Sequence, residues 1–292
     1  MKSSYYKYFA ALLLFGSNGI VASNINLPSY EIVLLRLLLG SLFLITVFTV
    51  SRQRFTFYRN KHTCLYLFIS ASAMGASWML LYEAYQQVGI SIASLAYYCG
   101  PVIVMILSPF LFRETLTWPK IAGFLTVLAG MCLVNLQALD EGKTIWGLFC
   151  GLMSAFMYAL MVTANKKAKP ESGLENSLLQ LVIGSFIVVA FVSMQKNFLL
   201  SLTTIDWIPV LLLGLLNTGI GCYLYFSSIT DLPVQTVAIC GYLEPLSAVV
   251  FSVLFLHEVL LPLQMLGAVL ILGGAIFGEC FKPEKPQRPQ QK

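Results

Sequence analysis

The chain has 292 residues, of which 58% are hydrophobic and 11% are charged, and its mean hydropathy is +0.80. Because about a quarter of the residues of a soluble domain are charged, this composition excludes a soluble globular protein and indicates an integral membrane protein. The formal net charge of +5 is explained by where the basic residues lie along the chain, so it does not indicate nucleic-acid binding.

Apolar segments alternate with short polar breaks along the whole chain. Segments of this length cross a bilayer as helices, whereas barrel strands are about ten residues long and alternate in polarity. The sequence therefore predicts an all-α membrane protein with ten transmembrane helices. We place them near 7–24, 31–51, 64–86, 91–112, 119–137, 145–166, 175–195, 207–228, 234–256 and 261–280.

Basic residues fall on one side of these predicted spans. Most of the 18 Lys and Arg residues lie in segments that share a side with the N-terminus, whereas the opposite loops hold only Lys143 and Lys196. By the positive-inside rule, both termini are predicted to be cytoplasmic in a cell (inner or plasma) membrane. Residues 281–292, rich in Pro and basic residues, are predicted to form a disordered cytoplasmic tail.

The first span carries a polar patch, Gly16-Ser17-Asn18-Gly19, at mid-depth. Small residues allow transmembrane helices to pack closely, and this is one interpretation of the two glycines. For Asn18, packing and exposure to a cavity are equal alternatives.

Two charged residues lie inside the second and third spans. Arg36 lies a third of the way into its span, where one interpretation is an interfacial anchor with a long flexible side chain. Glu83 lies at a similar depth near the outer end of the third span. Our hypothesis is that the two form an ion pair, which would satisfy two costly charges together.

Spans three and four are rich in aromatic residues. Trp78, Tyr82 and Tyr85 share one helix face, since they are spaced by four and then three residues, and Tyr97 and Tyr98 follow. Tyr85, near the end of its span, is expected to lie at the membrane–water interface, where Trp and Tyr are enriched. The remaining stripe is either core packing or a surface that contacts substrate.

Two prolines and two glutamates recur at matching places. Pro101 and Pro245 fall in the middle of predicted spans, where a bent helix serves either as a hinge or cavity wall or as a passive kink. Glu114 and Glu258 end spans four and nine, and we expect each to cap the helix that follows, because acids are favourable at helix N-termini.

The ninth span contains a single charge, Glu244, near the middle of Val234–Leu256. A carboxylate at that depth is costly unless it is partnered or neutralised, and such residues commonly mark transport pathways. We hypothesise that Glu244 cycles a proton or binds a cationic group of the substrate.

An internal repeat organises the chain. A shift of 144 residues places residues 31–41 over 175–185, Tyr98 over Tyr242 and Pro101 over Pro245 without a gap. Each half, 1–137 and 145–280, has five predicted spans, so the second half is inverted in the membrane. Inverted repeats are a transporter architecture with the site near the midplane between the halves.

The same spacing resembles a known family. In each half a Pro is followed by Glu after thirteen residues, Gly after nine more and Gly after a further seven. This pattern is similar to the EamA repeat of the drug/metabolite transporter superfamily. Arg36 also fits, whereas its second-half equivalent, Gln180, departs from it. The resemblance implies ten helices, cytoplasmic termini, a central cavity and transport of small metabolites such as amino acids.

The predicted function is therefore secondary-active transport of a small metabolite, by alternating access and with proton coupling as an open alternative. The alternatives are a channel, or a membrane-embedded receptor or enzyme, although no clustered catalytic residues, cofactor motif or metal-ligand spacing supports an enzyme. We expect a small-molecule substrate, no cofactor, and a monomer or homodimer in the lipid bilayer. The predicted substrate-binding residues are Glu244, Tyr242, Tyr98, Trp78, Tyr82, Glu83 and Asn18. The predicted structural or hinge residues are Pro101, Pro245, Glu114, Glu258 and Arg36.

Overall fold

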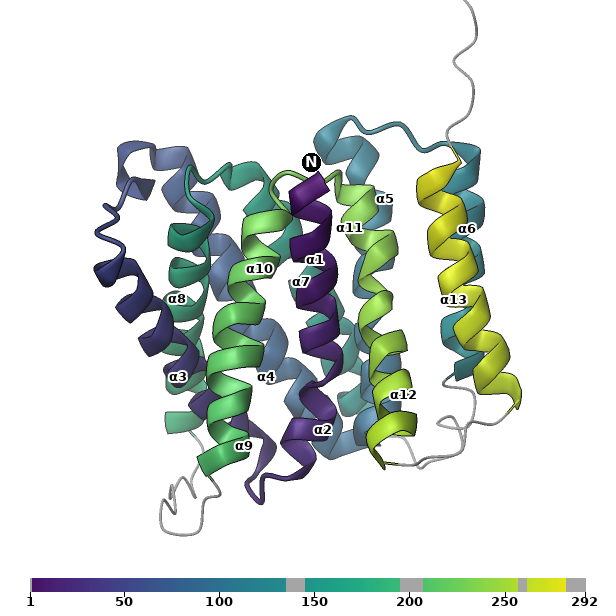
Figure 1. Cartoon of the computed structure of the whole chain (residues 1–292), viewed down its shortest axis with the longest axis horizontal. Coiled ribbons are helices and arrows are strands. Elements are labelled where there is room, and N and C mark those ends of the chain that lie inside the picture. The colour runs from purple at the N-terminus through teal and green to yellow at the C-terminus, as the bar shows by residue number, and fades with distance from the viewer. Residues whose placement is uncertain (1, 135–144, 195–206, 257–261, 282–292) are drawn as a thin grey trace, which may run out of the picture.

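The computed structural model is a bundle of upright helices (Figure 1), and it describes residues 2–134, 145–194, 207–256 and 262–281. All regular elements in these ranges are helical. The first half contains α1 (Lys2–Gly16), α2 (Asn18–Ser23), α3 (Ser29–Val50), η1 (Phe57–Arg59), α4 (Lys61–Tyr97), α5 (Gly100–Phe112) and α6 (Trp118–Val134). The second half contains α7 (Ile145–Ala168), α8 (Gly173–Ser193), α9 (Trp207–Leu211), the π-helix η4 (Leu212–Ile220), α10 (Gly221–Ser228), α11 (Val234–Gly241), α12 (Leu243–Leu256) and α13 (Pro262–Cys280).

Six segments of the described residues are long and apolar enough to cross a membrane. They are Tyr30–Val50, Lys61–Val88, Ile145–Ala168, Gly173–Ser193, Trp207–Ser228 and Val234–Phe255. Three shorter apolar helices are Gly100–Phe112, Trp118–Leu133 and Met265–Gly278. The all-helical membrane fold is thus confirmed, whereas the number of ten spans remains a prediction.

The helix breaks differ from those that the sequence predicted. Helix α4 continues without interruption through the break expected between residues 86 and 91, and ends at Tyr97. The breaks lie instead at Tyr98–Cys99 and at Tyr242. Pro101 and Pro245 therefore stand in the first turns of α5 and α12 and not inside bent helices. In a first turn proline removes no hydrogen bond, because those amides lack helical partners anyway.

Contacts between equivalent residues show the symmetry of the two halves directly. The Ser41 and Ser185 hydroxyl oxygens are 3.0 Å apart, and the Tyr242 hydroxyl donates to the Tyr98 carbonyl oxygen at 2.7 Å. Each pair is separated by the repeat length of 144 residues. Residues that are equivalent under a two-fold axis can touch only near that axis, so the contacts of α3 with α8 and of α5 with α11 lie on it.

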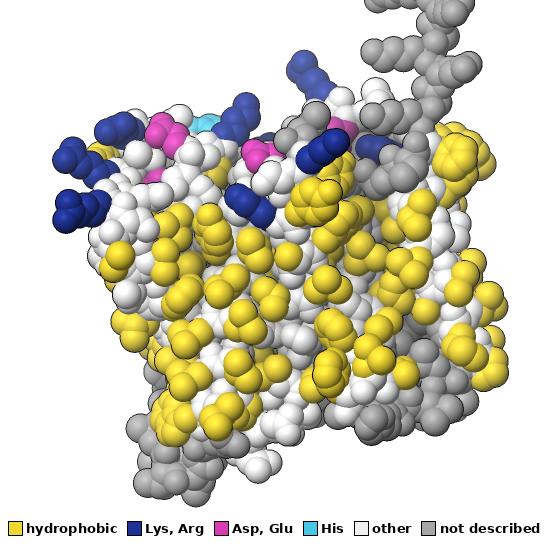
Figure 2. All heavy atoms as spheres, viewed as in Figure 1, with side chains coloured by type: hydrophobic (Ala, Val, Ile, Leu, Met, Phe, Trp, Pro, Cys, Tyr) yellow, Lys and Arg dark blue, Asp and Glu magenta, His cyan; other side chains and the backbone are white. Residues whose placement is uncertain are grey.

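The charged side chains define one end of the molecule. Figure 2 shows Lys and Arg gathered at that end and hydrophobic side chains covering the flank below it. Ser4, near the start of α1, donates to Asp231 at 2.8 Å, and Lys166, near the end of α7, donates to the Thr230 carbonyl at 2.6 Å. Since the start of α1 and the end of α7 meet the same loop, these equivalent helices run in opposite directions.

Helices α6 and α13 form a pair at one edge of the bundle (Figure 1), packed through glycines. A Cβ added to Gly274 would lie 2.6 Å from the Gly123 carbonyl oxygen, and one added to Gly130 would lie 2.6 Å from the Gly267 carbonyl oxygen. The two contacts are related by the repeat, because Gly123 and Gly130 are equivalent to Gly267 and Gly274.

We expect Gly274→Ala to lower the free energy of unfolding by about 1–3 kcal/mol, the usual cost of overpacking. The neighbouring Gly273 provides a matched control, because a Cβ there meets nothing within 4 Å. Thermal denaturation of the purified variants in one detergent checks this. Equal stability of Gly273→Ala and Gly274→Ala would contradict close packing of α6 on α13.

Candidate functional site

Glu244 lies in the first turn of α12, immediately after the break at Tyr242. Its side chain is half-buried, and its carboxylate has no hydrogen bond within the described part of the chain. Because the amides at a helix N-terminus carry a partial positive charge, this position favours an anionic side chain. The N-terminus of α12 thus carries a carboxylate that is unpartnered in the part of the chain that the structure describes.

The break before α12 packs against the break between α1 and α2. A Cβ on Gly16 would collide with the Ser247 hydroxyl and would lie 2.9 Å from the Glu244 carbonyl oxygen. Ser247 donates to that same carbonyl at 2.8 Å. The missing side chain at Gly16 therefore allows α1 to support the turn that carries Glu244, which agrees with the packing interpretation of this glycine.

Tyrosines from three helices lie near the turn that carries Glu244. A Cβ on Gly241, three residues before Glu244, would lie 3.5 Å from the Tyr8 hydroxyl of α1 and 3.9 Å from the Tyr158 hydroxyl of α7. Tyr85 and Tyr97 of α4 and Tyr98 at its end belong to the same electrostatic environment. The cluster is continuous, since the ring centroids of Tyr97 and Tyr158 are 5.5 Å apart and those of Tyr97 and Tyr98 are 5.7 Å apart. These tyrosines form a polar aromatic wall beside the turn that carries Glu244.

Two members of this wall, Tyr8 and Tyr158, and its neighbour Tyr225 were not found from the sequence. Tyr158 and Tyr225 place their hydroxyl oxygens 3.3 Å apart, and the rings of Tyr8 and Tyr225 are 5.6 Å apart. They come from α1, α7 and α10, which lie far apart in the sequence. No spacing pattern connects them, because only the tertiary fold brings these helices together.

Tyr242 has a different environment from the one expected of a substrate contact. Its side chain is fully buried, and its hydroxyl is engaged by the Tyr98 carbonyl. In this conformation Tyr242 joins the two helix breaks at the symmetry axis. Tyr98 itself is half-buried and belongs to the wall around Glu244.

The hypothesis of an ion pair between Arg36 and Glu83 is wrong. The Arg36 guanidinium lies over the Trp78 ring, 4.5 Å from its centroid, and Nε donates to the Thr218 hydroxyl at 2.9 Å. Glu83 instead accepts hydrogen bonds from Gln87 at 3.2 Å and from the Trp146 indole at 3.3 Å. Arg36 is only 7% exposed, so it is not an interfacial anchor either.

The aromatic residues on one face of α4 make two kinds of contact. Trp78 supports Arg36, whereas Tyr82 packs edge-on against Tyr85 with the ring centroids 5.2 Å apart. Both Trp78 and Tyr82 are half-buried. The stripe connects the Arg36 environment to the tyrosines near Glu244, while Glu83 lies apart from it, beside Trp146.

The π-helix η4 supplies polar groups to this region. The Asn217 side-chain amide donates to the Leu14 carbonyl and the Ser17 hydroxyl, each at 2.8 Å, and to Asn18 Oδ1 at 3.0 Å. Thr218 donates to the Leu213 carbonyl and accepts from Arg36. Asn18 is thus part of the contact between η4 and the α1–α2 break. Asn217 and Thr218 were not identified from the sequence, although an adjacent polar pair inside an apolar span is a signal that could have indicated them.

The surroundings of Gly100 explain why only the second repeat carries an acid at the position of Glu244. It is equivalent to Glu244, and a Cβ there would lie 2.6 Å from the Tyr158 ring and 3.2 Å from the Ala155 carbonyl oxygen. A longer side chain has no space where α5 packs on α7. The site is therefore asymmetric within a symmetric fold.

Glu114 caps a helix, but not the one predicted. Its carboxylate accepts from the backbone amides of Val234 at 2.8 Å and Gln235 at 3.1 Å, at the N-terminus of α11 and not of α6. It therefore connects the two halves at the charged end. The equivalent residue, Glu258, lies outside the described residues, as does the predicted tail beyond Phe281.

We expect Glu114→Ala to lower the free energy of unfolding by about 1–3 kcal/mol, because two helix-terminal amides lose a charged acceptor. Glu171→Ala is the control, since Glu171 is exposed at the same end. Thermal denaturation in detergent compares the two. Equal stability of both variants with the wild type would contradict the capping role.

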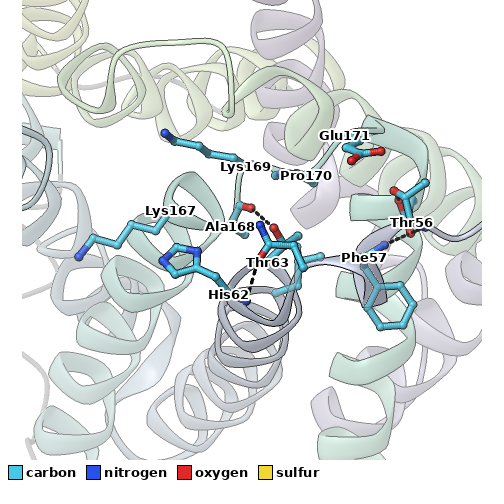
Figure 3. Close-up of a pocket in the computed structure, with 12 residues that line it drawn as sticks. Thr56, Phe57, His62, Thr63, Lys167, Ala168, Lys169, Pro170 and Glu171 are labelled. Carbon is cyan, nitrogen blue, oxygen red and sulfur yellow. Dashed lines mark hydrogen bonds between the residues drawn. The ribbon is translucent and has the colours of Figure 1, made fainter.

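A pocket of about 290 Å³ opens at the charged end, between the α3–α4 and α7–α8 connections (Figure 3). Lys167 and Lys169 extend away from its centre in this view. Its buried acid, Glu175, already accepts from the Phe57 amide at 2.9 Å and the Thr56 hydroxyl at 2.6 Å. None of the predicted substrate-binding residues lines this pocket. Among the described residues, no group of His, Cys, Asp and Glu is arranged to hold a metal ion.

The chain is similar in sequence to bacterial transporters. The uncharacterized transporter YxxF of Bacillus subtilis (strain 168) is 27% identical over 275 residues, which cover 92% of this chain and 86% of the relative. The threonine/homoserine exporter RhtA of Escherichia coli (strain K12) is 27% identical over 243 residues, which cover 83% of this chain and 79% of that protein. A solved crystal structure shares the fold, with a TM-score of 0.80 over 95% of this chain and 98% of the other, at 17% identity.

A family model agrees with the internal repeat. The model of the EamA-like transporter family matches residues 3–136 and again residues 145–278. The matches fall on the two halves that contact each other through equivalent residues. The chain is therefore a member of the EamA-like transporter family, with two copies of its repeat.

Proposed function

We propose that the protein is a secondary-active transporter, an exporter or permease, for a small metabolite of the amino-acid class. The observation that carries this proposal is Glu244, a carboxylate inside the bundle that has no hydrogen-bond partner among residues 2–134, 145–194, 207–256 and 262–281. Half-helix ends near the midplane form the binding sites of transporters with inverted repeats. The threonine/homoserine exporter similar to this chain supports the substrate class.

The mechanism follows from the symmetry. We propose that the repeats, 1–137 and 145–280, rock about the contacts at the symmetry axis and expose the site to each side in turn. The basic end of the molecule faces the cytoplasm with both chain termini, in accord with the positive-inside rule (Figure 2). In this mechanism Glu244 binds a cationic group of the substrate, or a proton that is exchanged for it.

A ligand screen tests the substrate class. Purified full-length protein is heated with each of the common L-amino acids, with amines, nucleosides and carboxylic acids, since a ligand that binds the folded state raises its stability. We expect one or more amino acids to raise the unfolding temperature and to be taken up by proteoliposomes. Stabilisation only by compounds of another class would overturn the assignment to amino acids.

A further inference from the structure

Arg36 is held in a fixed orientation inside the bundle. Its guanidinium lies on the Trp78 ring, and its Nε donates to Thr218, whose own hydroxyl donates to the Leu213 carbonyl. A π-helix therefore fixes one edge of the guanidinium, and an aromatic ring covers one of its faces. This is the geometry of an arginine positioned in advance for a ligand.

The other edge of the guanidinium has no protein partner. Within the described residues, the two Nη groups make no hydrogen bond, although the side chain is only 7% exposed. Neither nitrogen belongs to the fully enclosed atoms that lack a partner, which are Ser72 Oγ and Gln235 Oε1. Because a buried unpaired charge is costly, two free donors facing accessible space indicate a binding position for an anion. Two parallel N–H donors match a carboxylate.

Glu244 provides the opposite charge nearby. Arg36 donates to Thr218, and the preceding residue of η4, Asn217, donates to the Ser17 hydroxyl at 2.8 Å. A Cβ on Gly16, beside Ser17, would lie 2.9 Å from the Glu244 carbonyl oxygen, so a short chain of contacts connects the two charged residues. Yet no ion pair joins them in the described structure, and neither charge has another ionic partner there. Arg36 and Glu244 thus lie in the same part of the bundle with opposite charges, and neither charge is paired among the described residues.

The two charges come from different repeats and have neutral counterparts. The residue equivalent to Arg36 is Gln180, which is fully buried and donates to Ser70 at 2.9 Å. The residue equivalent to Glu244 is Gly100, which has no space for a side chain. A ligand that contacts both Arg36 and Glu244 would therefore bridge the two repeats, the parts that move relative to each other in alternating access.

We propose that Arg36 and Glu244 form a bipolar clamp for an α-amino acid zwitterion, with Arg36 Nη1 and Nη2 on the carboxylate and the Glu244 carboxylate on the ammonium group. The clamp rests on the proposed function as an amino-acid transporter and specifies how the site selects its substrate. An amine without a carboxylate leaves Arg36 unpaired, and an acid without an ammonium group leaves Glu244 unpaired. Sites with buried polar groups reject such analogues strongly.

Derivatives of one amino acid test the clamp. L-Threonine, or whichever common L-amino acid binds, is compared with its methyl ester, which lacks the carboxylate charge, and its N-acetyl derivative, which lacks the ammonium charge. Affinities are measured calorimetrically on the purified full-length protein. We expect the wild type to bind each derivative about 10- to 100-fold more weakly than the parent amino acid, as for loss of one charged hydrogen-bonding partner.

Two variants separate the ends of the clamp. Arg36→Gln installs the residue that the other repeat carries at this position, and we expect it to weaken amino-acid binding about 10- to 100-fold and ester binding by less than about threefold. It should retain the discrimination against the N-acetyl derivative. Glu244→Gln should show the reverse pattern, with loss of discrimination against the N-acetyl derivative alone.

Two further variants serve as controls for Arg36→Gln. Arg54→Gln removes an exposed arginine at the charged end and should bind all three ligands as the wild type does. Arg36→Lys keeps the charge without the two-donor fork, so it should still prefer the amino acid to the ester if Arg36→Gln does not fold. Unchanged ester discrimination in Arg36→Gln, or loss of that preference in a folded Arg36→Lys, would overturn the clamp. Failure of the wild type to bind any amino acid would overturn the proposed function as well.

Discussion

Replacement of Glu244 by glutamine is expected to lower the transport efficiency by about 10- to 100-fold, the equivalent of one hydrogen bond to a charged group of about 1.5–3 kcal/mol. Glutamine has nearly the same shape but carries neither a charge nor a titrating proton. Whether Glu244 binds a cation or a proton, the variant loses that step. Initial uptake rates of the identified amino acid into proteoliposomes measure the effect.

The outcome also separates the two roles of Glu244. If the acid cycles a proton, the wild-type rate varies with pH and the residual rate of the variant does not. Glu171→Gln, which removes an exposed acid, should transport as the wild type does. A Glu244→Gln protein with full rate and full pH dependence would remove Glu244 from the mechanism.

Addition of a single methyl group at Gly16 is the second change with a large expected effect. In Gly16→Ala the new Cβ collides with the Ser247 hydroxyl and lies 2.9 Å from the Glu244 carbonyl oxygen. The Ser247 side chain can rotate, but the backbone at Glu244 must move. Since displacement of a binding group by about 1 Å can cost 100-fold in rate, we expect transport to fall by at least about tenfold.

Gly19 provides the matched control for Gly16. It lies in α2, three residues further on, and a Cβ there meets nothing within 4 Å. Gly19→Ala should therefore retain wild-type uptake in the same proteoliposome assay. If both variants transport equally well, the α1–α12 contact does not position Glu244.

The repeat and the helical architecture were predictable because they depend on local hydrophobicity and on matching residues. The helix breaks were only partly predictable. Pro101 and Pro245 marked the right regions, but proline is equally compatible with a kink and with a first helical turn. The break positions depend on how Tyr98 and Tyr242 join the two halves across the symmetry axis, which is a tertiary contact.

Glu244 and Tyr98 of the candidate site were predictable from the sequence, whereas the contacts of Arg36 and Glu83 were not. Arg36 and Glu83 were paired because their depths are similar, yet depth does not fix the direction in which a side chain points. Glu83 is five residues after Trp78, so at about 100° per residue the two point to different sides of α4. Trp78 contacts Arg36, and Glu83 turns instead to Trp146 of α7.

Solute counterflow tests the central claim of the account, that Glu244 belongs to the site of an alternating-access amino-acid transporter. Proteoliposomes loaded with an unlabelled amino acid are diluted into a trace of the same labelled compound. Wild-type protein should accumulate label transiently and saturably above protein-free liposomes, and Glu244→Gln should accumulate far less. Non-saturable equilibration without accumulation, or equal accumulation by the two proteins, would contradict the account.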